Sequence, residues 1–266
     1  MKKKLICLVL AAACIAAFAA CGKKGVDTNN VKGYDDLIAL NPKIGVQIGT
    51  TGDIFASDSV EDGGFGEENV EKYSKGMDAV QALAQGKIDA VVIDDEPAKA
   101  FISDAEGLRI LDEVYVEEAY AMCFAKGSEL TQQFNQAIAE LKADGTFDAI
   151  IEYYIEGKGE RYESPANADR SNGALVMATN AEFPPYEYKE NDEILGIDAD
   201  LAQAIADRLG MSLTIEDMSF DSIIMAVQGG KADFGAAGMT VTEERKEEVD
   251  FSDSYYTGRQ VIIVRK

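Results

Sequence analysis

Short apolar runs alternate with helix-length amphipathic runs through two parts of the chain. The first part predicts strands over residues 43–48 and 89–93, a tight turn over 49–52, and helices over 77–85, 130–143 and 146–155. The second part predicts strands over 174–179, 212–217, 234–236 and 261–264, and helices over 197–209 and 223–229. Alternation of this kind is typical of parallel sheets covered by helices, in which binding sites form at the carboxyl ends of the strands.

A polar segment, residues 157–173, separates these two parts. It contains Gly, Pro, Ser and Asn without an apolar period, which indicates a linker. Residues 82–91 and 226–235 are similar to each other, since each has a helix end closed by Gly, then a Lys, then an Asp that opens an apolar strand. This match supports two lobes of similar build.

The N-terminus has the pattern of a secretory signal. Three lysines precede an apolar run over residues 5–20, which is shorter than the ~20 residues of a comfortable bilayer span. Residues 18–22, Phe-Ala-Ala-Cys-Gly, resemble the lipobox of bacterial lipoproteins, although Phe18 stands where Leu is usual. We expect a signal peptide over 1–20, a lipid-bearing Cys21 that anchors the chain to the cell membrane, and a flexible tether over 21–33. Ordinary signal cleavage, which would leave a secreted protein, is the alternative.

The cysteines and the absence of histidine limit the disulfides, catalytic pairs and metal sites that the chain can form. Cys7 and Cys14 lie in the predicted signal and Cys21 would carry lipid, so Cys123 stands alone without a disulfide partner or a metal-binding spacing. The sequence has no histidine, which excludes Ser-His and Cys-His catalytic pairs and most zinc sites. We expect no metal and no cofactor.

The charge is strongly acidic. The chain has 48 acidic and 25 basic residues, and loss of the three signal lysines would leave 22 basic residues and a net charge of −26. Such a field repels nucleic acid and anionic lipid surfaces. Because the acids are spread among apolar runs, and 47% of the residues are hydrophobic, the composition indicates a soluble surface over a core large enough for two domains of ~120 residues.

Several motifs of the second part are specific: ATNAEFPPYEY at 178–188, GIDADL at 196–201, Phe220-Asp221, AGMTVTEERK at 237–246 and DFS at 250–252. They resemble the first lobe of the extracellular solute-binding proteins (family 3 type) of polar amino acid ABC transporters. The first part carries motifs similar to the second lobe of that family, GTTGD at 49–53 and DAVVID at 89–94. The resemblance implies a two-lobed α/β fold of the periplasmic-binding-protein-like (type II) kind, with a ligand cleft between the lobes.

The order of these motifs differs from that of the family, whose members run first lobe, second lobe, then back to the first. Here the second lobe is expected over 34–116 and the first over 117–266, with the returning segment near 119–155 and the usual termini joined through 157–173. The chain is therefore predicted to be circularly permuted, which close termini make tolerable; a misassembled gene is the alternative. The permutation predicts a single crossover near 114–120, and a strand ending at Lys266 close to the segment that enters at Val31.

The resemblance also implies a clamp for the two charges of a free amino acid. Arg245 would bind the carboxylate, with donors from Thr240 and Thr51. Asp94 would bind the ammonium, with the carbonyl of Gly238 and the hydroxyl of Thr240. The resemblance implies two aromatic residues around the aliphatic part of the ligand side chain, Phe183 and Phe220. It also implies three polar residues that face this side chain, Asn180, Glu182 and Gln47. These residues do not decide between a neutral polar and a cationic amino acid as the ligand.

Since Arg245 and Asp94 belong to different lobes, the ligand would bind by closing them. The expected protein is a monomer that carries a free amino acid to an ABC transporter permease and is not an enzyme. The alternatives are a dehydratase of cyclic carboxylic acids, for which Glu182 would be the acid, a sensory module, and a permuted chain that has lost function.

Overall fold

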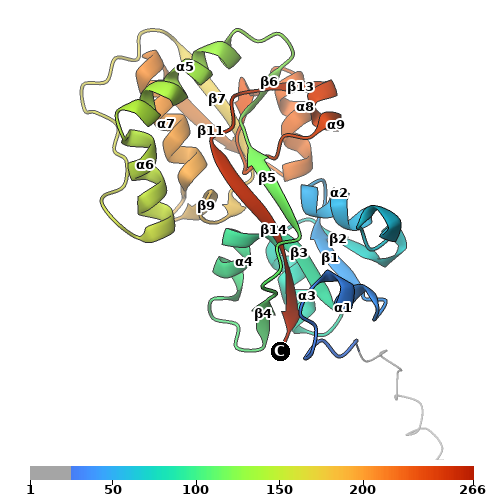
Figure 1. Ribbon diagram of the computed structural model, residues 1–266. Coiled ribbons are helices and arrows are strands. Elements are labelled where there is room, and N and C mark those ends of the chain that lie inside the picture. Colours follow the sequence, from blue (N-terminus) through green and yellow to red (C-terminus); the bar gives the residue numbers. More distant parts are fainter. Residues whose placement is uncertain (1–24) are drawn as a thin grey trace, which may run out of the picture.

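The computed structural model describes residues 25–266, which form two lobes joined by two long strands (Figure 1). One sheet has the order β11-β7-β12-β6-β13 and lies in the upper lobe of the figure; the other has the order β2-β1-β3-β14-β4 and lies in the lower lobe. The predicted two-lobed α/β fold is confirmed. The predicted signal peptide and Cys21 lie outside the described residues. Among residues 25–266, no helix combines the length and hydropathy needed to cross a membrane.

The lower lobe is a mixed sheet flanked by short helices. Its elements are α1 (Tyr34–Ile38), β1 (Ile44–Gln47), α2 (Thr51–Ser57), η1 (Val60–Asp62), η2 (Glu67–Asn69), β2 (Val70–Tyr73), α3 (Gly76–Ala84), β3 (Ala90–Asp94), α4 (Asp95–Ile102) and β4 (Leu108–Ile110). Strand β1 pairs in parallel with both β2 and β3. The turn predicted over 49–52 is present at Gly49 and Thr50, but α2 already starts at Thr51, because the Thr50 hydroxyl accepts a hydrogen bond of 3.3 Å from the backbone N–H of Asp53 and caps the helix.

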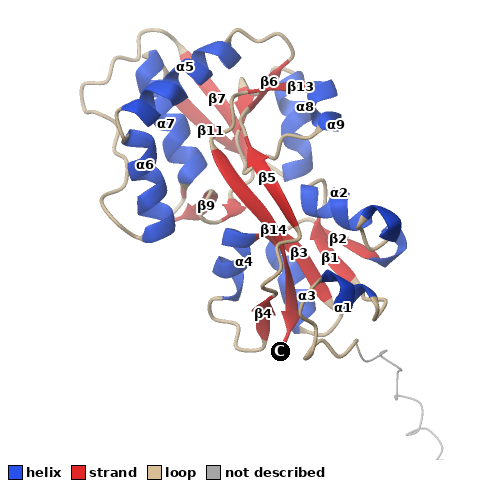
Figure 2. Cartoon of the chain, in the orientation of Figure 1, coloured by secondary structure: helices blue, strands red, loops and turns tan. Residues whose placement is uncertain are grey.

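The upper lobe has helices on both sides of its sheet (Figure 2). Its elements are β6 (Cys123–Ala125), α5 (Leu130–Ala143), α6 (Thr146–Ile151), the π-helix η3 (Glu152–Glu156), β7 (Ala174–Thr179), α7 (Ile197–Leu209), β11 (Ser212–Asp217), η4 (Phe220–Ser222), α8 (Ile223–Gln228), β12 (Phe234–Gly235), α9 (Glu243–Glu248) and β13 (Val249–Phe251). A small antiparallel sheet of β8 (Glu182–Phe183), β9 (Glu187–Glu190) and β10 (Glu193–Leu195) follows β7. The predicted helices and strands are therefore present, with shifts at their ends.

The lobes are connected by the antiparallel pair β5 (Val116–Tyr120) and β14 (Tyr256–Arg265). Strand β14 pairs first with β5 and then runs into the lower sheet, where Gln260 to Val264 lie opposite Asp94 to Ala90. The expectation of a single crossover near 114–120 is thus wrong, and 117–266 does not lie wholly in one lobe. The reason is that residues 261–264 are apolar and at most 6% exposed, which requires a place between β3 and β4.

The C-terminal strand and the segment that enters near Val31 lie side by side. The hydroxyl of Thr28 donates a hydrogen bond of 2.9 Å to the carbonyl of Arg265, and Nη2 of Arg109 donates to the carbonyls of Thr28 (2.8 Å) and Val31 (2.6 Å). The predicted proximity is confirmed. Because Thr28 and Val31 are only 2% and 4% exposed, the tether expected over 21–33 is wrong for residues 26–33, which pack onto the lobe.

The two similar sequence segments have the same structural role in both lobes. The N–H of Asp89 donates to the carbonyl of Lys43 (2.8 Å), and its carboxylate accepts from the N–H of Lys43 (2.9 Å). In the other lobe, Asp233 makes the same pair of bonds with Val176, at 2.8 and 2.7 Å. Each aspartate therefore ties the start of one strand to its neighbour, which confirms that the lobes are of similar build.

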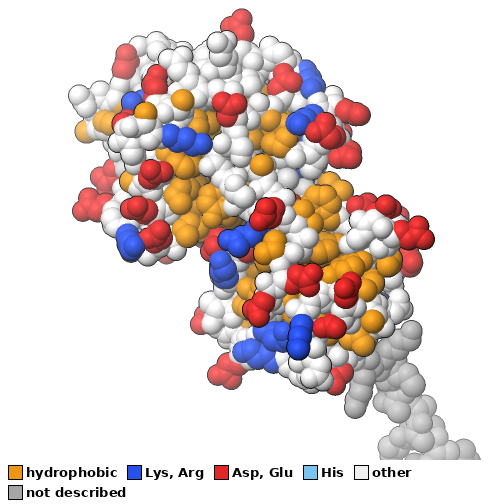
Figure 3. Space-filling model, in the orientation of Figure 1, with side chains coloured by type: hydrophobic (Ala, Val, Ile, Leu, Met, Phe, Trp, Pro, Cys, Tyr) orange, Lys and Arg blue, Asp and Glu red, His pale blue; other side chains and the backbone are white. Residues whose placement is uncertain are grey.

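The linker over 157–173 is held against α7 by charged groups. The guanidinium of Arg161 donates to both oxygens of Asp200 at 3.0 to 3.2 Å, and Asp207 accepts from the hydroxyls of Tyr162 (3.0 Å) and Ser164 (2.5 Å). Elsewhere, acidic side chains are scattered over both lobes on the face shown in Figure 3, in agreement with the dispersed charge of the sequence.

Candidate functional site

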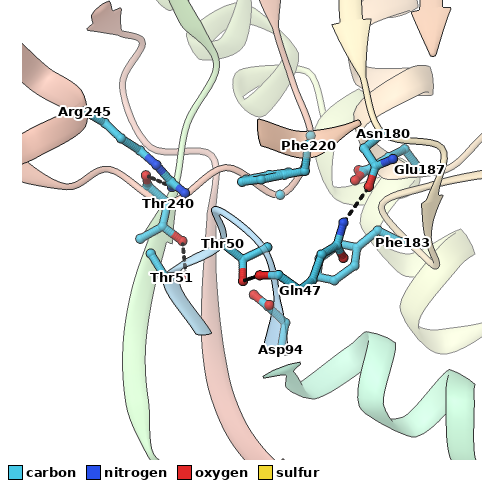
Figure 4. Close-up of a pocket in the computed structure, with 12 residues that line it drawn as sticks. Gln47, Thr50, Thr51, Asp94, Asn180, Phe183, Glu187, Phe220, Thr240 and Arg245 are labelled. Carbon is cyan, nitrogen blue, oxygen red and sulfur yellow. Dashed lines mark hydrogen bonds between the residues drawn. The ribbon is translucent and has the colours of Figure 1, made fainter. Parts of the chain in front are cut away.

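A small cavity lies between the lobes, close to the strands that join them. It has a volume of about 10 Å³, which is roughly the space of one water molecule. The lobes are therefore closed onto each other. Nine of the ten ligand-binding residues predicted from the sequence line this cavity (Figure 4), namely Gln47, Thr51, Asp94, Asn180, Phe183, Phe220, Gly238, Thr240 and Arg245. The other lining residues are Thr50, Glu187 and Ala237.

Strand ends position most of these side chains. Gln47 and Asp94 are the last residues of β1 and β3, and Asn180 follows the last residue of β7 directly. Thr51 is the first residue of α2, which starts where β1 has ended. Because the carboxyl ends of parallel strands meet at one edge of a sheet, strands from both lobes bring their polar residues to the same gap.

Arg245 is the only cation among the described residues that line the cavity, and backbone carbonyls accept its hydrogen bonds. Its Nη1 donates to the carbonyl of Thr240 at 2.7 Å, and its Nη2 donates across the cleft to the carbonyl of Gly49 at 2.9 Å. The ring centroid of Phe220 lies 5.4 Å from the guanidinium carbon, a cation–π distance. Burial lowers the pKa of Arg245, but a guanidinium starts from so high a value that it stays charged. Within residues 25–266, this buried cation is therefore hydrogen-bonded to backbone carbonyls and to no carboxylate.

Two glycines bring backbone close to this cation and to an aromatic wall. Gly49 and Gly238 have positive φ angles of 77° and 52°, a region that glycine enters without strain. A Cβ atom on Gly238 would lie 3.2 Å from the ring of Phe183, so the ring rests against bare backbone. These positions leave little room for a side chain and define the narrow shape of the cavity.

Asp94 forms the acidic side of the site, within a buried polar network. Its two oxygens accept hydrogen bonds from the hydroxyl of Tyr120 and from Nε2 of Gln260 (2.8 Å). Burial is the main cause that raises the pKa of Asp94 well above its usual range, and the neighbouring carboxylate of Glu118 raises it further. A cation placed beside Asp94 would counter both effects.

Glu118 and Gln260 belong to this network and were not found by sequence reasoning. Oε2 of Glu118 accepts from the hydroxyl of Thr240 (3.0 Å) and from Nε2 of Gln260 (3.1 Å). Both residues lie on the connecting strands β5 and β14, and their side chains are 5% and 0% exposed. Strand alternation alone does not show which polar residue of a connecting strand turns toward a cleft.

Two further polar contacts cross the cleft. Nε2 of Gln47 donates to Oδ1 of Asn180 at 2.9 Å, and the hydroxyl oxygens of Thr51 and Thr240 lie 3.5 Å apart. The amide of Gln47 is fixed from its other side, since its Oε1 accepts from the N–H of Gly76 at 3.2 Å. Predicted ligand contacts from opposite lobes are thus hydrogen-bonded to one another.

Glu182 is the predicted site residue that the structure places elsewhere. It forms an ion pair across the lobes with Lys75 outside the cavity lining, and its side chain is 33% exposed. The reason is the alternation of strand β8: Phe183 turns into the cavity, so its neighbour turns away.

Glu187 takes the inward place instead. On the β8–β9 hairpin it lies directly opposite Phe183, and cross-strand partners share a face of the sheet. Reading the register of these two strands around the double proline from the sequence would have shown that Glu187 shares a face with Phe183. Glu187 is completely buried.

Comparison with known proteins gives matches that cover part of the chain. Residues 175–266 match the model of bacterial extracellular solute-binding proteins, family 3. The arginine-binding extracellular protein ArtP of Bacillus subtilis is 42% identical over 103 residues, which are 39% of this chain and 40% of that protein. The arginine-binding protein ArgT of Corynebacterium glutamicum is 39% identical over 89 residues, 33% of this chain and 29% of that protein.

Among solved structures, the arginine-bound form of domain 1 from TmArgBP is 47% identical, with 36% of this chain and 82% of that chain covered and a TM-score of 0.32. The chain thus spans less than half the length of the two curated relatives described above. Over residues 175–266 the chain belongs to family 3 of the bacterial extracellular solute-binding proteins, and the resemblance noted in the sequence is confirmed.

Proposed function

We propose that the protein binds a free polar amino acid between its two lobes and releases it to an ABC importer. One observation carries the proposal: Arg245 and Asp94 come from different lobes and line the same buried cavity. A free amino acid has a carboxylate and an ammonium on one carbon atom, and both charges need partners when water is excluded. Arg245 would hold the carboxylate with Thr51 and Thr240, and Asp94 would hold the ammonium.

Ligand entry requires the lobes to separate, since a cavity of about 10 Å³ does not hold an amino acid. The cross-cleft bonds of Arg245 to Gly49 and of Gln47 to Asn180 would break on opening. When the lobes close around a ligand, the same groups would form hydrogen bonds with the ligand instead of with one another. Binding would therefore shift the population of open and closed forms, and the closed form would be the one that a permease recognises.

We infer in addition that the chain is a circular permutation of its family. The family match begins at residue 175, directly after the linker over 157–173, and ends with the chain at residue 266. The partial match supports this inference, because a colinear comparison of a permuted chain covers only one of its two pieces, although the sheets of both lobes are present. The hydrogen bond between Thr28 and Arg265 is a further support, because these residues belong to the two segments that the family order would join.

Lipid attachment at Cys21 would hold the protein at the outer face of the membrane, close to its permease. The support is the lipobox-like sequence over 18–22 after a basic and apolar leader. A binding role without catalysis fits the charges assigned to the ligand, and Glu182, the acid considered for a dehydratase, lies outside the cavity.

Calorimetry of the purified chain against the twenty amino acids tests the proposal. Arginine is the first ligand to examine, because the two curated relatives described above are named arginine-binding proteins. We expect saturable one-to-one binding. NMR spectra of the ligand, recorded during incubation with the protein, should stay unchanged. If a folded chain binds none of the twenty, the proposal fails; conversion of the ligand, or of prephenate or arogenate, would instead establish an enzyme.

A further inference from the structure

Two buried acids, Asp94 and Glu118, share one hydrogen-bond donor beside the cavity. Nε2 of Gln260 donates to Oδ2 of Asp94 at 2.8 Å and to Oε2 of Glu118 at 3.1 Å. Each acid is only 5% exposed. Both carboxyl groups therefore lie within hydrogen-bonding distance of the same nitrogen atom, and two negative charges so close and so well buried repel each other strongly.

The register of the connecting strands brings these acids together. Gln260 of β14 lies opposite Asp94 of β3 on one side and opposite Val116 of β5 on the other. Side chains two residues apart in a strand share a face, so Glu118 lies on the face of Val116 and reaches Gln260 diagonally. The residue directly opposite Glu118 in β14 is Gly258, which has no side chain to separate Glu118 from Gln260.

The donors around the pair are neutral and do not reach every oxygen. The hydroxyl of Tyr120 donates to Oδ1 of Asp94, and the hydroxyl of Thr240 donates to Oε2 of Glu118 at 3.0 Å. Together with the amide of Gln260, they leave Oε1 of Glu118 buried and without a hydrogen-bond partner within residues 25–266. A proton on the pair would reduce both its charge and the cost of this unpartnered oxygen.

The cation of the cavity lining is not bonded to the pair. Arg245 donates its hydrogen bonds to backbone carbonyls, and Figure 4 shows its guanidinium apart from the carboxylate of Asp94. The proposed function assigns the charge of Arg245 to the ligand carboxylate. The charge of Asp94 also acts on three side chains that are not cations, namely Tyr120, Tyr186 and Glu187. Asp95, the next residue in the chain, pairs with Lys99 (3.7 Å) and Arg259 (3.6 Å).

The electrostatics of Asp94 agree with this geometry. Burial raises the pKa of Asp94 well above its usual range, and the charge of Glu118 raises it further, although the hydrogen bonds from Tyr120 and Gln260 act in the opposite direction. Two carboxylates with one proton between them carry a single negative charge, and so do two carboxylates with one ammonium between them. A proton and a ligand ammonium can therefore occupy the pair in turn.

We propose that Asp94 and Glu118 hold one proton between them until a ligand binds, and that the ligand ammonium displaces this proton. The proton passes to the solvent, and the ammonium becomes the positive charge between the two carboxylates. Glu118 is thus a second acid of the ammonium site, on a strand that connects the lobes. This inference rests on the proposed function and adds that acid favours release of the amino acid. Affinity should rise about tenfold per pH unit wherever the free protein still carries the proton.

Calorimetry in two buffers of different ionisation enthalpy, phosphate and Bis-Tris, counts the protons that binding releases. Arginine is the probe, or the amino acid that binds best if the survey of the twenty selects another. At about pH 6 ordinary carboxyl groups and the α-ammonium of the ligand keep their charges, so a released proton comes from a carboxyl group whose pKa is raised. Binding to the unmodified protein should therefore be accompanied by proton release.

Two variants on β5 identify the source of the proton. Glu118→Gln keeps a hydrogen-bonding side chain but leaves Asp94 as a single acid, so the release should fall by close to one proton per ligand, and the rise of affinity with pH should weaken accordingly. Glu117→Gln is the matched control, because this neighbour is exposed, and its proton count should equal that of the unmodified protein.

Equal binding heats in the two buffers for the unmodified protein would overturn the inference. A folded Glu118→Gln variant that releases as many protons as the unmodified protein would overturn it as well. If Glu118→Gln does not fold, the pH dependence of the unmodified protein decides, and an affinity that stays constant from pH 5 to pH 7 is equally fatal. Absence of binding of any of the twenty amino acids would instead refute the proposed function.

Discussion

Nη2 of Arg245, in one lobe, donates a hydrogen bond of 2.9 Å to the carbonyl oxygen of Gly49, in the other. The bond joins the lobes through the one cation of the cavity lining. It shows that the guanidinium reaches the facing lobe. Arg245 would therefore serve both states of the cleft, as a contact between lobes and as a contact to a carboxylate.

Removing either charge of the clamp should weaken ligand binding. For Arg245→Ala and for Asp94→Ala we expect losses of ~2 to 5 kcal/mol, because each change leaves one buried ligand charge without a partner. Calorimetry with the best ligand of the unmodified protein measures the loss. Lys246→Ala is the control, since this neighbour of Arg245 is exposed and pairs with Glu243. An affinity that survives one of the two changes would show that the corresponding charge was assigned wrongly.

The bond between Gln47 and Asn180 should help to hold the ligand-free protein closed. Asn180→Ala removes the acceptor of that 2.9 Å bond, and we expect a larger radius of gyration by small-angle X-ray scattering without ligand. Saturating ligand should restore the compact value, because ligand contacts replace the lost bond. Identical scattering of the ligand-free variant and the unmodified protein would mean that this contact does not hold the closed form.

Asp198 should make stability decrease as the pH rises from about 4 to about 6. Burial raises its pKa from the ordinary value of 3.8 to about 6, so between these values the folded protein keeps a proton that the unfolded chain has lost. Its contribution to the free energy of unfolding is fully present below the unfolded pKa and is lost as the pH passes the folded pKa. The size is about 3 kcal/mol.

Urea unfolding of the unmodified protein and of Asp198→Asn at pH 4 and pH 7 isolates this effect from other carboxyl groups. The difference in unfolding free energy between the two proteins should change by that amount between the two pH values. A constant difference would indicate that the pKa of Asp198 is not raised in the folded protein.

The linker should lose its attachment when Asp200 is removed. Asp200 is 2% exposed and accepts hydrogen bonds from Arg161 and, at 2.7 Å, from the hydroxyl of Tyr154. Asp200→Ala is expected to cost about 1 to 3 kcal/mol, since it leaves two partly buried donors unsatisfied. Urea unfolding gives the cost, and limited proteolysis should cut within 157–173 faster. Glu193→Gln, at the exposed partner of Arg161, should change neither.

Lipid attachment depends on residue 21. Growth with labelled palmitate should label the protein, and Cys21→Ala should abolish the label and release the protein from the membrane fraction. An unlabelled but secreted protein would favour ordinary signal cleavage.

Local sequence patterns determined the elements and most of the site. The apolar period over 197–209 and 130–143 gave α7 and α5 with the observed bounds, because each helix covers a sheet with one apolar face. The resemblance implied Gln47 and Asp94 as site residues, and both lie at the ends of parallel strands, whose carboxyl ends meet at a common edge. The motifs around Arg245 and Phe183 led to the same cavity.

Only the tertiary structure determined in which lobe strand β14 is buried and which acidic side chain faces the cavity. Strand β14 had to complete the lower sheet because its apolar residues needed burial on both faces, and no local pattern shows in which lobe that burial is available. Glu182 and Glu187 are both acids of one motif, yet the register of a hairpin turned one outward to Lys75 and the other into the cavity. A sequence states which side chains exist, whereas pairing across strands fixes which of them face each other.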